Sequence, residues 1–417
     1  MNARKPDGQA GQGGAPGSDV GEPAAWQAFD LFAPSEEHAL FAETLRAFVE
    51  REVEPQAALH DREERFNLEL FRQAGALGLL GVTLPERYGG AGLDAVAAVQ
   101  LLEALSFSDP GFGLAVLAHS FLFAHNLWVN GNEEQCGRLL PGVASGEQVA
   151  GMCMTEPGAG TDVLSMQTRA RPEGEGWRLD GVKTFITNGG IDGETLGDVF
   201  IVYAATGERS LSAFLVEKGM EGFRLGQKWE DKLGMRASLT AELVFDGVWL
   251  PERNLMGETG QGTQHMMRNL EIERLTLAAQ GLGIAQRSLR VMVDYASERK
   301  SFGRPLRDFG QIQRHIAETF AEYSAARAYV YDTARRLSFT AAGQRVDADA
   351  TKLFAAQMAK RAADAAMQVL GGAGYMGENV VERLWRDAKL LEIGGGTLEA
   401  HHKNITKDLS RDPSLIG

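Results

Sequence analysis

Cysteine is scarce in this chain of 417 residues, which contains only Cys136 and Cys153. The two lie far apart in sequence and are not spaced like metal ligands. A small disulfide-stabilised scaffold is therefore excluded, and so is a cysteine-based zinc site. We expect no metal centre.

Basic residues are outnumbered by acidic ones. Lysine and arginine number 42 against 56 aspartates and glutamates, for a formal net charge of −14. We therefore expect no nucleic-acid partner and no charge-driven attachment to an anionic membrane. No apolar run approaches the length of a membrane-spanning helix, so we also expect no membrane insertion. The chain is long enough for two or three domains.

The first 34 residues lack hydrophobic periodicity. Residues 1–24 hold six glycines and three prolines, a composition typical of a disordered tail. They have no apolar core like that of a secretory signal, and acidic residues after Ser18 do not fit a transit peptide. The expected location is the cytoplasm.

Three regions of different character follow the tail. Residues 35–150 have helical periodicity, beginning at a capping Ser35, and residues 151–258 are rich in short β-like runs. Residues 259–417 return to long helices, at 261–298, roughly 310–341, 346–371 and 379–410. We predict a mainly α fold with a middle β domain. It has no βαβ alternation and no strand-anchored GxGxxG, so a Rossmann nucleotide site is not supported.

Two local features sharpen this outline. The run GFGLAVLAHSFLFAHNLWV after Pro110 is apolar nearly all round, which predicts a buried helix. His119 within it is expected to be a hydrogen-bonded core residue rather than a catalyst. Asp180-Gly181 separates two short strand-like runs and predicts a hairpin turn.

The helix predicted at 261–298 carries an unusual carboxylate. Glu273 lies three residues after Leu270 and four before Leu277, which places it on the apolar face. Glu271 is rotated away and is expected to meet solvent. A carboxylate on an apolar face is either paired, with Arg274 or a distant cation, or kept for proton chemistry. Spacing alone does not decide between these alternatives.

Two stretches near the β region have ligand-binding character. MCMTEPGAGTD, Met152–Asp162, offers hydroxyls and exposed backbone N–H groups to a ligand, or is a tight connector. KTFITNGG, Lys183–Gly190, places Phe185 and Thr187 two residues apart on one strand. That pair suits a flat heterocycle, although an ordinary half-buried strand has the same pattern.

The C-terminal third contains three further stretches of this kind. In ERKSFGRPLRDFGQIQ, Glu298–Gln313, basic residues either cap the long helix or bind a pyrophosphate. The glycine runs QVLGGAGY, Gln368–Tyr375, and EIGGGTLE, Glu392–Glu399, allow close backbone approach or mark helix ends. His401-His402 has no second ligand cluster nearby and is expected at the surface.

Taken together and in order, these stretches resemble the acyl-CoA dehydrogenase family, from about Ala33 to Ser410. The most specific pieces are MTEPGAGTD, KTFITNGG, DKLGMRAS, ERKSFG, LGGAGY and WRDAKLLEIGGGT. The resemblance implies a homotetramer whose subunits have an N-terminal helical domain, a middle β-barrel or sandwich domain and a C-terminal four-helix bundle. It further implies FAD between β domain and bundle, an acyl-CoA substrate, and an electron-transferring flavoprotein as redox partner.

The resemblance also assigns cofactor-binding positions. One group would surround the flavin and another would reach the FAD of an adjacent subunit. The first comprises Met152, Met154, Thr155, Thr161, Phe185, Thr187, Thr397 and Glu399, and the second Arg299, Ser301, Phe302, Gln368 and Gly372. Phe185 stands where many relatives have Trp. Gly310 stands where many have Gln, so one cofactor hydrogen bond is absent or moved to Gln311.

The catalytic base is the most informative departure. Many family members carry it in a C-terminal loop of pattern I-Y-E-G-T, where this chain has Ile393-Gly394-Gly395-Gly396-Thr397. A smaller group, which includes isovaleryl-CoA dehydrogenase, carries it on the long helix in an E-R-L pattern, matched here by Glu273-Arg274-Leu275. The resemblance therefore makes Glu273 the base, with the Gly395 N–H stabilising the enolate.

Gly394 and Gly395 also leave room near the acyl chain. The substrate-binding positions implied by the resemblance are Thr161, Leu114, Ala118, Arg274, Leu277 and Gly394. We expect a short branched substrate, isovaleryl-CoA first, converted to 3-methylcrotonyl-CoA. A longer terpenoid or straight-chain acyl-CoA is the alternative. Rival classes are an oxygen-using flavoenzyme on the same fold and a non-catalytic acyl-CoA-binding protein.

Overall fold

The computed structural model describes residues 29–339, 343 and 345–416. Most of the predicted tail lies outside these residues. Its last part, residues 29–34, runs without regular structure against helix α4 (Ala95–Ser108), where the Gln100 amide donates to the Phe32 carbonyl at 2.8 Å.

The N-terminal region is helical, as predicted. Its helices are α1 (Glu36–Phe48), α2 (Glu54–Arg62), α3 (Leu68–Ala76), α4 (Ala95–Ser108), α5 (Pro110–Leu117), α6 (Asn126–Asn130) and α7 (Glu133–Ala144). Ser35 caps α1, where its hydroxyl accepts from the His38 N–H, and Asn132 closes a reciprocal capping box with Gln135. Residues 49–53 and 118–125 are π-helical and join α1 to α2 and α5 to α6.

The segment Pro110–Asn130 requires a correction. It is 21 residues long and, by length and composition alone, apolar enough to cross a membrane, contrary to the expectation from sequence. However, 83% of its most apolar window is buried inside the protein. His119 illustrates this burial, since its ring bonds to the Val143 carbonyl at 2.8 Å and accepts from the Ala150 N–H at 3.1 Å. We interpret the segment as a core helix.

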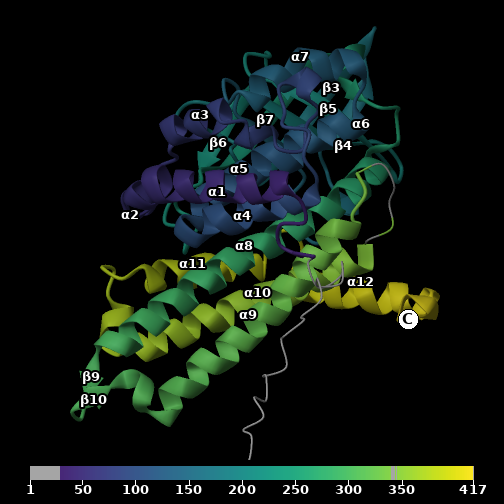
Figure 1. Ribbon diagram of the computed structural model, residues 1–417. Helices are drawn as coiled ribbons and strands as arrows, with labels where there is room; N and C mark the ends of the chain where they lie inside the picture. The colour runs from purple at the N-terminus through teal and green to yellow at the C-terminus, as the bar shows by residue number, and fades with distance from the viewer. Residues whose placement is uncertain (1–28, 340–342, 344, 417) are drawn as a thin grey trace, which may run out of the picture.

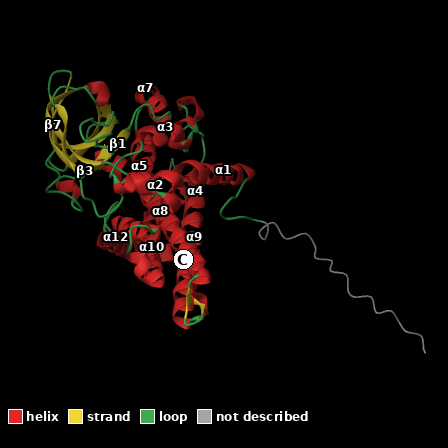
Figure 2. Cartoon of the chain, turned by 90° about the vertical axis from the view of Figure 1, so that its left-hand side faces the viewer, coloured by secondary structure: helices red, strands yellow, loops and turns green. Residues whose placement is uncertain are grey.

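The middle region forms one curved, mostly antiparallel sheet (Figure 2). Its strands are β1 (Ala150–Cys153), β2 (Arg169–Pro172), β3 (Gly176–Thr187), β4 (Val199–Gly207), β5 (Ser210–Glu217), β6 (Phe223–Lys228), β7 (Thr240–Pro251) and β8 (Leu255–Met256). They are ordered β6-β7-β3-β2-β4-β5-β8, and β1 pairs in parallel with β4. The stretch expected as the loop Met152–Asp162 therefore begins inside a strand.

The predicted hairpin at Asp180-Gly181 is wrong. Strand β3 runs straight through it and pairs with β7 on both sides, with a register shift between Leu179 and Gly181. Gly181 has φ +152°, and a Cβ there would overlap the Thr168 side chain. The Asp-Gly pair marks a β-bulge, at which the glycine has a positive φ that residues with a Cβ rarely adopt.

The C-terminal region is a bundle of long helices (Figure 1). It contains α8 (Gly262–Glu298), α9 (Gly310–Arg336), α10 (Arg345–Leu370), α11 (Val380–Leu391) and α12 (Leu398–Arg411), with a short hairpin of β9 (Lys300–Ser301) and β10 (Arg304–Pro305) after α8. The helix predicted at 379–410 is thus two helices. Gly395 and Gly396, at φ +65° and +100°, break it because left-handed backbone cannot continue an α-helix.

Helix α8 is the shared centre of the two helical regions. It packs against α4 on one side and α10 on the other. A Cβ at Gly283 would overlap the Glu103 carbonyl of α4, and one at Gly281 would lie 3.0 Å from the Ala355 carbonyl of α10. Small residues thus let three helices approach closely, and residues of α4, α8 and α10 share one apolar cluster.

Candidate active site

Glu273 lies in the buried middle of α8. Only 7% of the residue is exposed, and its Oε2 has no hydrogen-bond partner among the residues that the structure describes. Burial raises the pKa of this carboxyl to about 7, although Arg274 and Lys352 nearby act to lower it. Arg274 is not its ion-pair partner, because its Nη1 donates to Asp349 Oδ2 at 2.9 Å. The carboxylate is therefore buried without a directly bonded cation.

The other carboxylate of this turn corrects a prediction. Glu271 was expected to meet solvent, yet it is 6% exposed. Residues 337–339, which follow α9, line a pocket together with Glu271, and the Gly343 N–H donates to Glu271 Oε1 at 3.3 Å. Helical periodicity places Glu273 on the inner face but cannot show that residues distant in sequence lie against the outer face.

The glycine loop after α11 lies directly over Glu273. A Cβ on Gly395 would overlap Leu277 Cδ1 and would lie 3.5 Å from Glu273 Oε1. The Gly394 N–H donates to the Leu390 carbonyl at 2.7 Å. Within the described part of the chain, the Gly395 N–H has no hydrogen-bond acceptor. The loop thus brings an unbonded N–H beside an unpaired carboxylate.

A buried polar network holds this loop from behind. Lys352 Nζ donates to the Gly396 carbonyl at 2.6 Å, and His401 Nε2 lies 3.1 Å from the same oxygen. His401 Nδ1 lies 2.5 Å from Asp349 Oδ1, while the other Asp349 oxygen accepts from Arg274. His401 is completely buried, so its expected surface position is wrong, whereas His402 is exposed. This network could not be predicted from the sequence, because Asp349 lies 52 residues before His401.

The expected acyl-pocket residues differ in their surroundings. Leu114, on α5, is half-buried and packs against the apolar cluster that contains Leu277. Ala118 follows on the same chain segment and is buried. Thr161, in contrast, is exposed in the loop after β1. Leu114 and Leu277 thus belong to one apolar cluster, Ala118 is buried, and the Thr161 hydroxyl lies at the surface.

The face of the β domain has the groups expected around a flat heterocycle. Phe185 is 61% exposed and has φ +57° at a bulge of β3. Its ring centroid lies 5.2 Å from that of Trp229, whose indole Nε1 is buried without a partner among the described residues. Thr187 is half-buried two residues further along β3. A wall of aromatic rings with an unused donor and a hydroxyl fits an isoalloxazine ring.

The other residues of the flavin group lie on two segments. Met152, Met154 and Thr155 are half-buried in β1 and the loop after it. Thr397 caps α12, where its hydroxyl accepts from the Ala400 N–H at 3.3 Å, and Glu399 is exposed in the first turn of that helix. Thr397 therefore has a structural role whether or not it contacts a cofactor.

The group expected to reach an adjacent subunit lies elsewhere. Arg299 follows α8, so it is about 40 Å along the helix from Glu273 at 1.5 Å per residue. The β9–β10 hairpin with Ser301 and Phe302 forms this far tip of the bundle (Figure 1). Gln368 and Gly372, at the end of α10, are exposed close to it. One chain does not bring this group to its own Glu273.

The Gly310 position has open space around it among the residues that the structure describes. Gly310 begins α9, and a Cβ there would meet nothing within 4 Å. Gln311 beside it is exposed.

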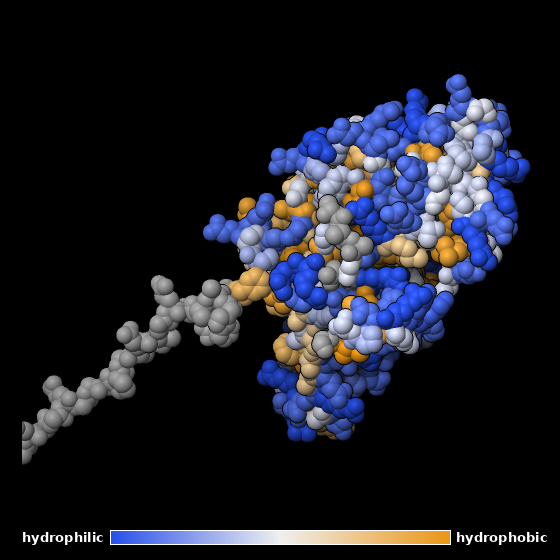
Figure 3. Space-filling view, turned by 90° about the vertical axis from the view of Figure 1, so that its right-hand side faces the viewer, coloured by the Kyte–Doolittle hydropathy of each residue, from blue (hydrophilic) through white to orange (hydrophobic). Residues whose placement is uncertain are grey.

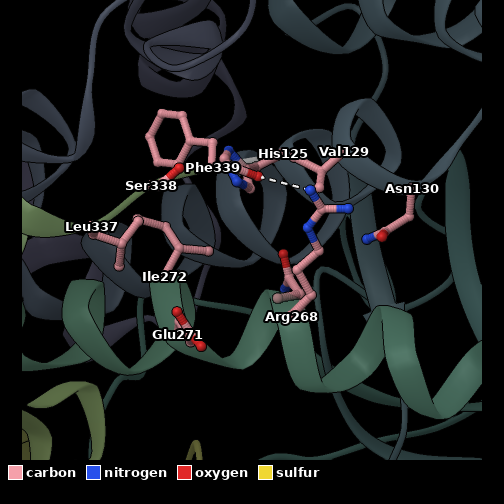
Figure 4. A pocket seen from close by; sticks show the side chains of 10 residues that line it. His125, Val129, Asn130, Arg268, Glu271, Ile272, Leu337, Ser338 and Phe339 are labelled. Carbon is pink, nitrogen blue, oxygen red and sulfur yellow. Dashed lines mark hydrogen bonds between the residues drawn. The ribbon is translucent and has the colours of Figure 1, made fainter. Parts of the chain in front are cut away.

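A small polar pocket next to α8 was not expected from the sequence (Figure 4). It is lined by His125, Val129, Asn130, Arg268, Asn269, Glu271, Ile272, Leu337, Ser338 and Phe339. Arg268 Nη2 donates to the Phe339 carbonyl at 3.3 Å. The volume of about 10 Å³ holds roughly one water molecule. Asn269, one helical turn before Glu273, has both amide atoms buried and unbonded among the described residues.

Comparison with protein families covers almost the whole described chain. Residues 35–147 match "Acyl-CoA dehydrogenase, N-terminal domain", residues 151–248 match "Acyl-CoA dehydrogenase, middle domain", and residues 260–410 match "Acyl-CoA dehydrogenase, C-terminal domain". Among curated proteins, the mitochondrial isovaleryl-CoA dehydrogenase of Solanum tuberosum is 38% identical over 379 residues, covering 89% of this chain and 90% of that protein.

Solved structures give the same result. Butyryl-CoA dehydrogenase from Megasphaera elsdenii superposes with a TM-score of 0.85 at 34% identity, covering 90% of this chain and 98% of the other. A glutaryl-CoA dehydrogenase from Mycobacterium smegmatis, in complex with FADH2, superposes with a TM-score of 0.85 at 29% identity, covering 91% of this chain and 95% of the other. The predicted fold class is confirmed.

Proposed function

The chain belongs to the acyl-CoA dehydrogenase family of FAD-dependent oxidoreductases, and from that premise we propose that its substrate is a short 3-methyl-branched acyl-CoA, isovaleryl-CoA first. The product would be 3-methylcrotonyl-CoA. The observation that carries the proposal is the meeting of Glu273 with the glycine loop that contains Gly395.

Glu273 acts as the base in this proposal. The α-C–H of a thioester is a weak acid, so its proton must pass to a base of raised pKa in a site that excludes water. Glu273 has a pKa raised to about 7 by burial, and its Oε2 has no bonded partner among the described residues. A carboxylate so placed accepts the α-proton more readily than one in water.

The Gly395 N–H stabilises the charge that forms on the thioester oxygen. As the α-proton leaves, the electron pair of the C–H bond moves toward that oxygen, which needs hydrogen-bond donors. The Gly395 N–H is free of other acceptors in the described structure and lies beside Glu273. Base and donor lie next to each other, so both could reach one bound thioester.

FAD is the proposed cofactor. When bound, it supplies the acceptor for the hydride that leaves the β-carbon. Phe185, Thr187 and Trp229 fit the role of holding its ring system, since they join aromatic surface to unused hydrogen-bonding groups. An electron-transferring flavoprotein is the proposed electron acceptor.

A homotetramer is the proposed assembly. The group at the tip of the bundle lies about 40 Å along α8 from Glu273, too far to serve the same active site. Apolar side chains emerge there, with Phe302 93% and Tyr375 82% exposed. Hydrophobic residues also break through the mostly hydrophilic surface in several patches (Figure 3). Contact with a neighbouring subunit would cover the exposed tip and bring Arg299 to that subunit's FAD.

The choice of acyl group rests on the glycine loop. Gly394 and Gly395 carry no side chains. A Cβ on Gly395 would overlap Leu277 Cδ1, whereas one on Gly394 would make only ordinary contacts, so the room for a branch at the β-carbon is the space that a side chain on Gly394 would otherwise fill. Similarity alone does not choose the substrate, because butyryl- and glutaryl-CoA dehydrogenases also superpose closely. A longer or terpenoid acyl-CoA is the second candidate, since glycine leaves space without limiting its length.

The test is an anaerobic titration of the flavin-loaded protein with isovaleryl-CoA, followed by flavin absorbance, with Glu273→Gln as the comparison. We expect wild type to bleach and Glu273→Gln to bind without bleaching. Much higher kcat/KM with butyryl-CoA or with a longer acyl-CoA would overturn the branched substrate. Rapid reoxidation in air with peroxide release would instead favour an oxygen-using flavoenzyme, and binding without bleaching in wild type would favour a non-catalytic protein.

A further inference from the structure

The loop of Gly394, Gly395 and Gly396 has no side chains with which to hold itself in place. Gly395 and Gly396 both have positive φ, and a glycine run has more conformational freedom than any other sequence. Yet the position of the Gly395 N–H decides whether it meets the thioester oxygen. Something outside the loop must therefore fix it.

Lys352 is one such anchor. It lies on α10, is completely buried, and donates from Nζ to the Gly396 carbonyl at 2.6 Å. In the described part of the chain no carboxylate lies within 4 Å of this ammonium group. A buried cation that bonds to a carbonyl instead of a carboxylate is costly, and a purely structural role would be served by a neutral donor.

The second anchor is His401. Its Nε2 lies 3.1 Å from the Gly396 carbonyl, and its Nδ1 faces Asp349 at 2.5 Å. Asp349 is in turn fixed by Arg274, which follows Glu273 in the sequence. The loop is therefore tied to α8, α10 and α12 together, and the rigid helices set its position.

A negative charge lies near Lys352 both before and after the proton transfer. Glu273, Arg274, Asp349 and Glu392 are the charged groups that act on it, and Glu273 is the first of them. Before the reaction, the Glu273 carboxylate balances the ammonium. When the α-proton moves from carbon to a Glu273 oxygen, the electron pair of the broken bond moves to the thioester oxygen. The negative charge is then on the enolate, still close to the same cation.

We propose that Lys352 is a positioning residue for α-proton abstraction. It holds the Gly396 carbonyl so that the Gly395 N–H faces the thioester oxygen. Its positive charge stabilises the negative charge first on the Glu273 carboxylate and then on the enolate. The proposal rests on the proposed function, because it needs Glu273 as base. It assigns a role to a buried lysine that lies far in sequence from both Glu273 and Gly395.

The experiment separates proton abstraction from hydride transfer. A 3-thia-acyl-CoA, which has sulfur in place of the β-carbon, loses its α-proton but cannot lose a β-hydride. The analogue is incubated with flavin-loaded protein in deuterated water. NMR then measures the exchange of the analogue's α-proton for deuterium, and a titration measures the Kd of the analogue. For Lys352→Met we expect exchange about 10- to 100-fold slower, with Kd changed less than about 3-fold. Lys352→Gln, which keeps a donor but not the charge, should fall between.

Lys232→Met is the matched control. Lys232 is a second enclosed lysine that donates to carbonyls, those of Met235 and Ser238, in the loop before β7. It should lose thermal stability while its exchange rate stays within about 2-fold of wild type.

The outcomes are distinct. Lys352→Met that exchanges as fast as wild type, or Lys232→Met that slows equally, overturns the proposal. If Lys352→Met does not fold, Lys352→Gln decides, and a wild-type exchange rate in that variant overturns it as well. A wild-type protein that binds the analogue without exchange, and isovaleryl-CoA without bleaching, overturns the proposed function itself.

Discussion

Ionisation of Glu273 should control the rate in the neutral range. Its pKa is raised to about 7, mainly by burial. A base must be deprotonated, so kcat/KM should rise about tenfold per pH unit below 7, and it should fall again above 7 as Lys352 loses its charge. Lys352, with a pKa lowered to about 7 by burial, titrates in the same range, so the profile will report the pair. Stopped-flow flavin reduction from pH 5.5 to 8.5 measures this. A flat profile would show that Glu273 is not the rate-controlling base.

A methyl group on Gly395 should damage the site through one contact. In Gly395→Ala the Cβ would overlap Leu277 Cδ1, and the positive φ disfavours any L-residue by roughly 1 kcal/mol. We expect kcat/KM with isovaleryl-CoA to fall at least about tenfold.

Leu277→Ala supplies the matching control for this substitution. In the double variant the overlap is removed, so part of the lost kcat/KM should return, and a double-mutant cycle measures the coupling. Strictly additive losses would mean that Gly395 does not act through Leu277.

Single residues also show which side-chain positions could be predicted from the sequence. Helical spacing was enough to place Glu273 on the buried face of α8, and the structure agrees. The same spacing failed for Glu271 and gave nothing for His401. Both contact residues distant in sequence, which are residues 337–339 and Gly343 for Glu271 and Asp349 of α10 for His401. Tertiary cover of this kind leaves no local pattern.

At the level of elements, the errors concern glycines. Gly181 predicted a turn and proved to be a bulge within β3. Gly395-Gly396 belongs to a glycine run that can end a helix, yet the helix was predicted to continue through it at 379–410. A glycine reports that the backbone is unusual but not which of several conformations it adopts. Strand and helix positions were otherwise accessible because hydrophobic periodicity extends over whole elements.

The β-bulge at Gly181 leads to a prediction about stability. Gly181→Ala should lower the free energy of unfolding by about 2–4 kcal/mol, because its Cβ would overlap Thr168 in addition to the strain of positive φ. Gly174→Ala is the control, since Gly174 has φ +61° but open space around it, and should cost only about 1 kcal/mol. Thermal melts compare the two. Equal losses would contradict the packing argument.

At the scale of the whole molecule, all three regions meet at Asp387 of α11. Its Oδ1 accepts from the Met235 N–H of the β region at 2.5 Å, and the neighbouring Arg386 bonds to Asp61 of α2 at 2.7 Å. The two motifs DKLGMRAS and WRDAK, separate in sequence, thus lie together. Resemblance predicted the three regions, but only the structure shows this junction.

Burial and the nearby Asp61 raise the pKa of Asp387 to about 7. The folded state therefore favours its protonated form. Its contribution to stability is complete below the ordinary pKa of 3.8 and is lost as pH rises through about 7. Asp387→Asn keeps an acceptor for the Met235 N–H but cannot ionise. Relative to wild type, we expect it to gain about 1 kcal/mol between pH 6 and pH 8. Melts at both pH values test this, and an identical pH dependence would contradict it.

The length of helix α8 also determines which defective chains could complement each other in a mixed assembly. Its middle carries Glu273 and its end carries Arg299, about 40 Å away. In the proposed tetramer, one chain's Glu273 works in its own pocket while its Arg299 serves a neighbour. Two defective chains, one altered at each position, would then restore some intact pockets when assembled together. Each complete active site would then need residues from two chains, because one helix carries groups that serve two different sites.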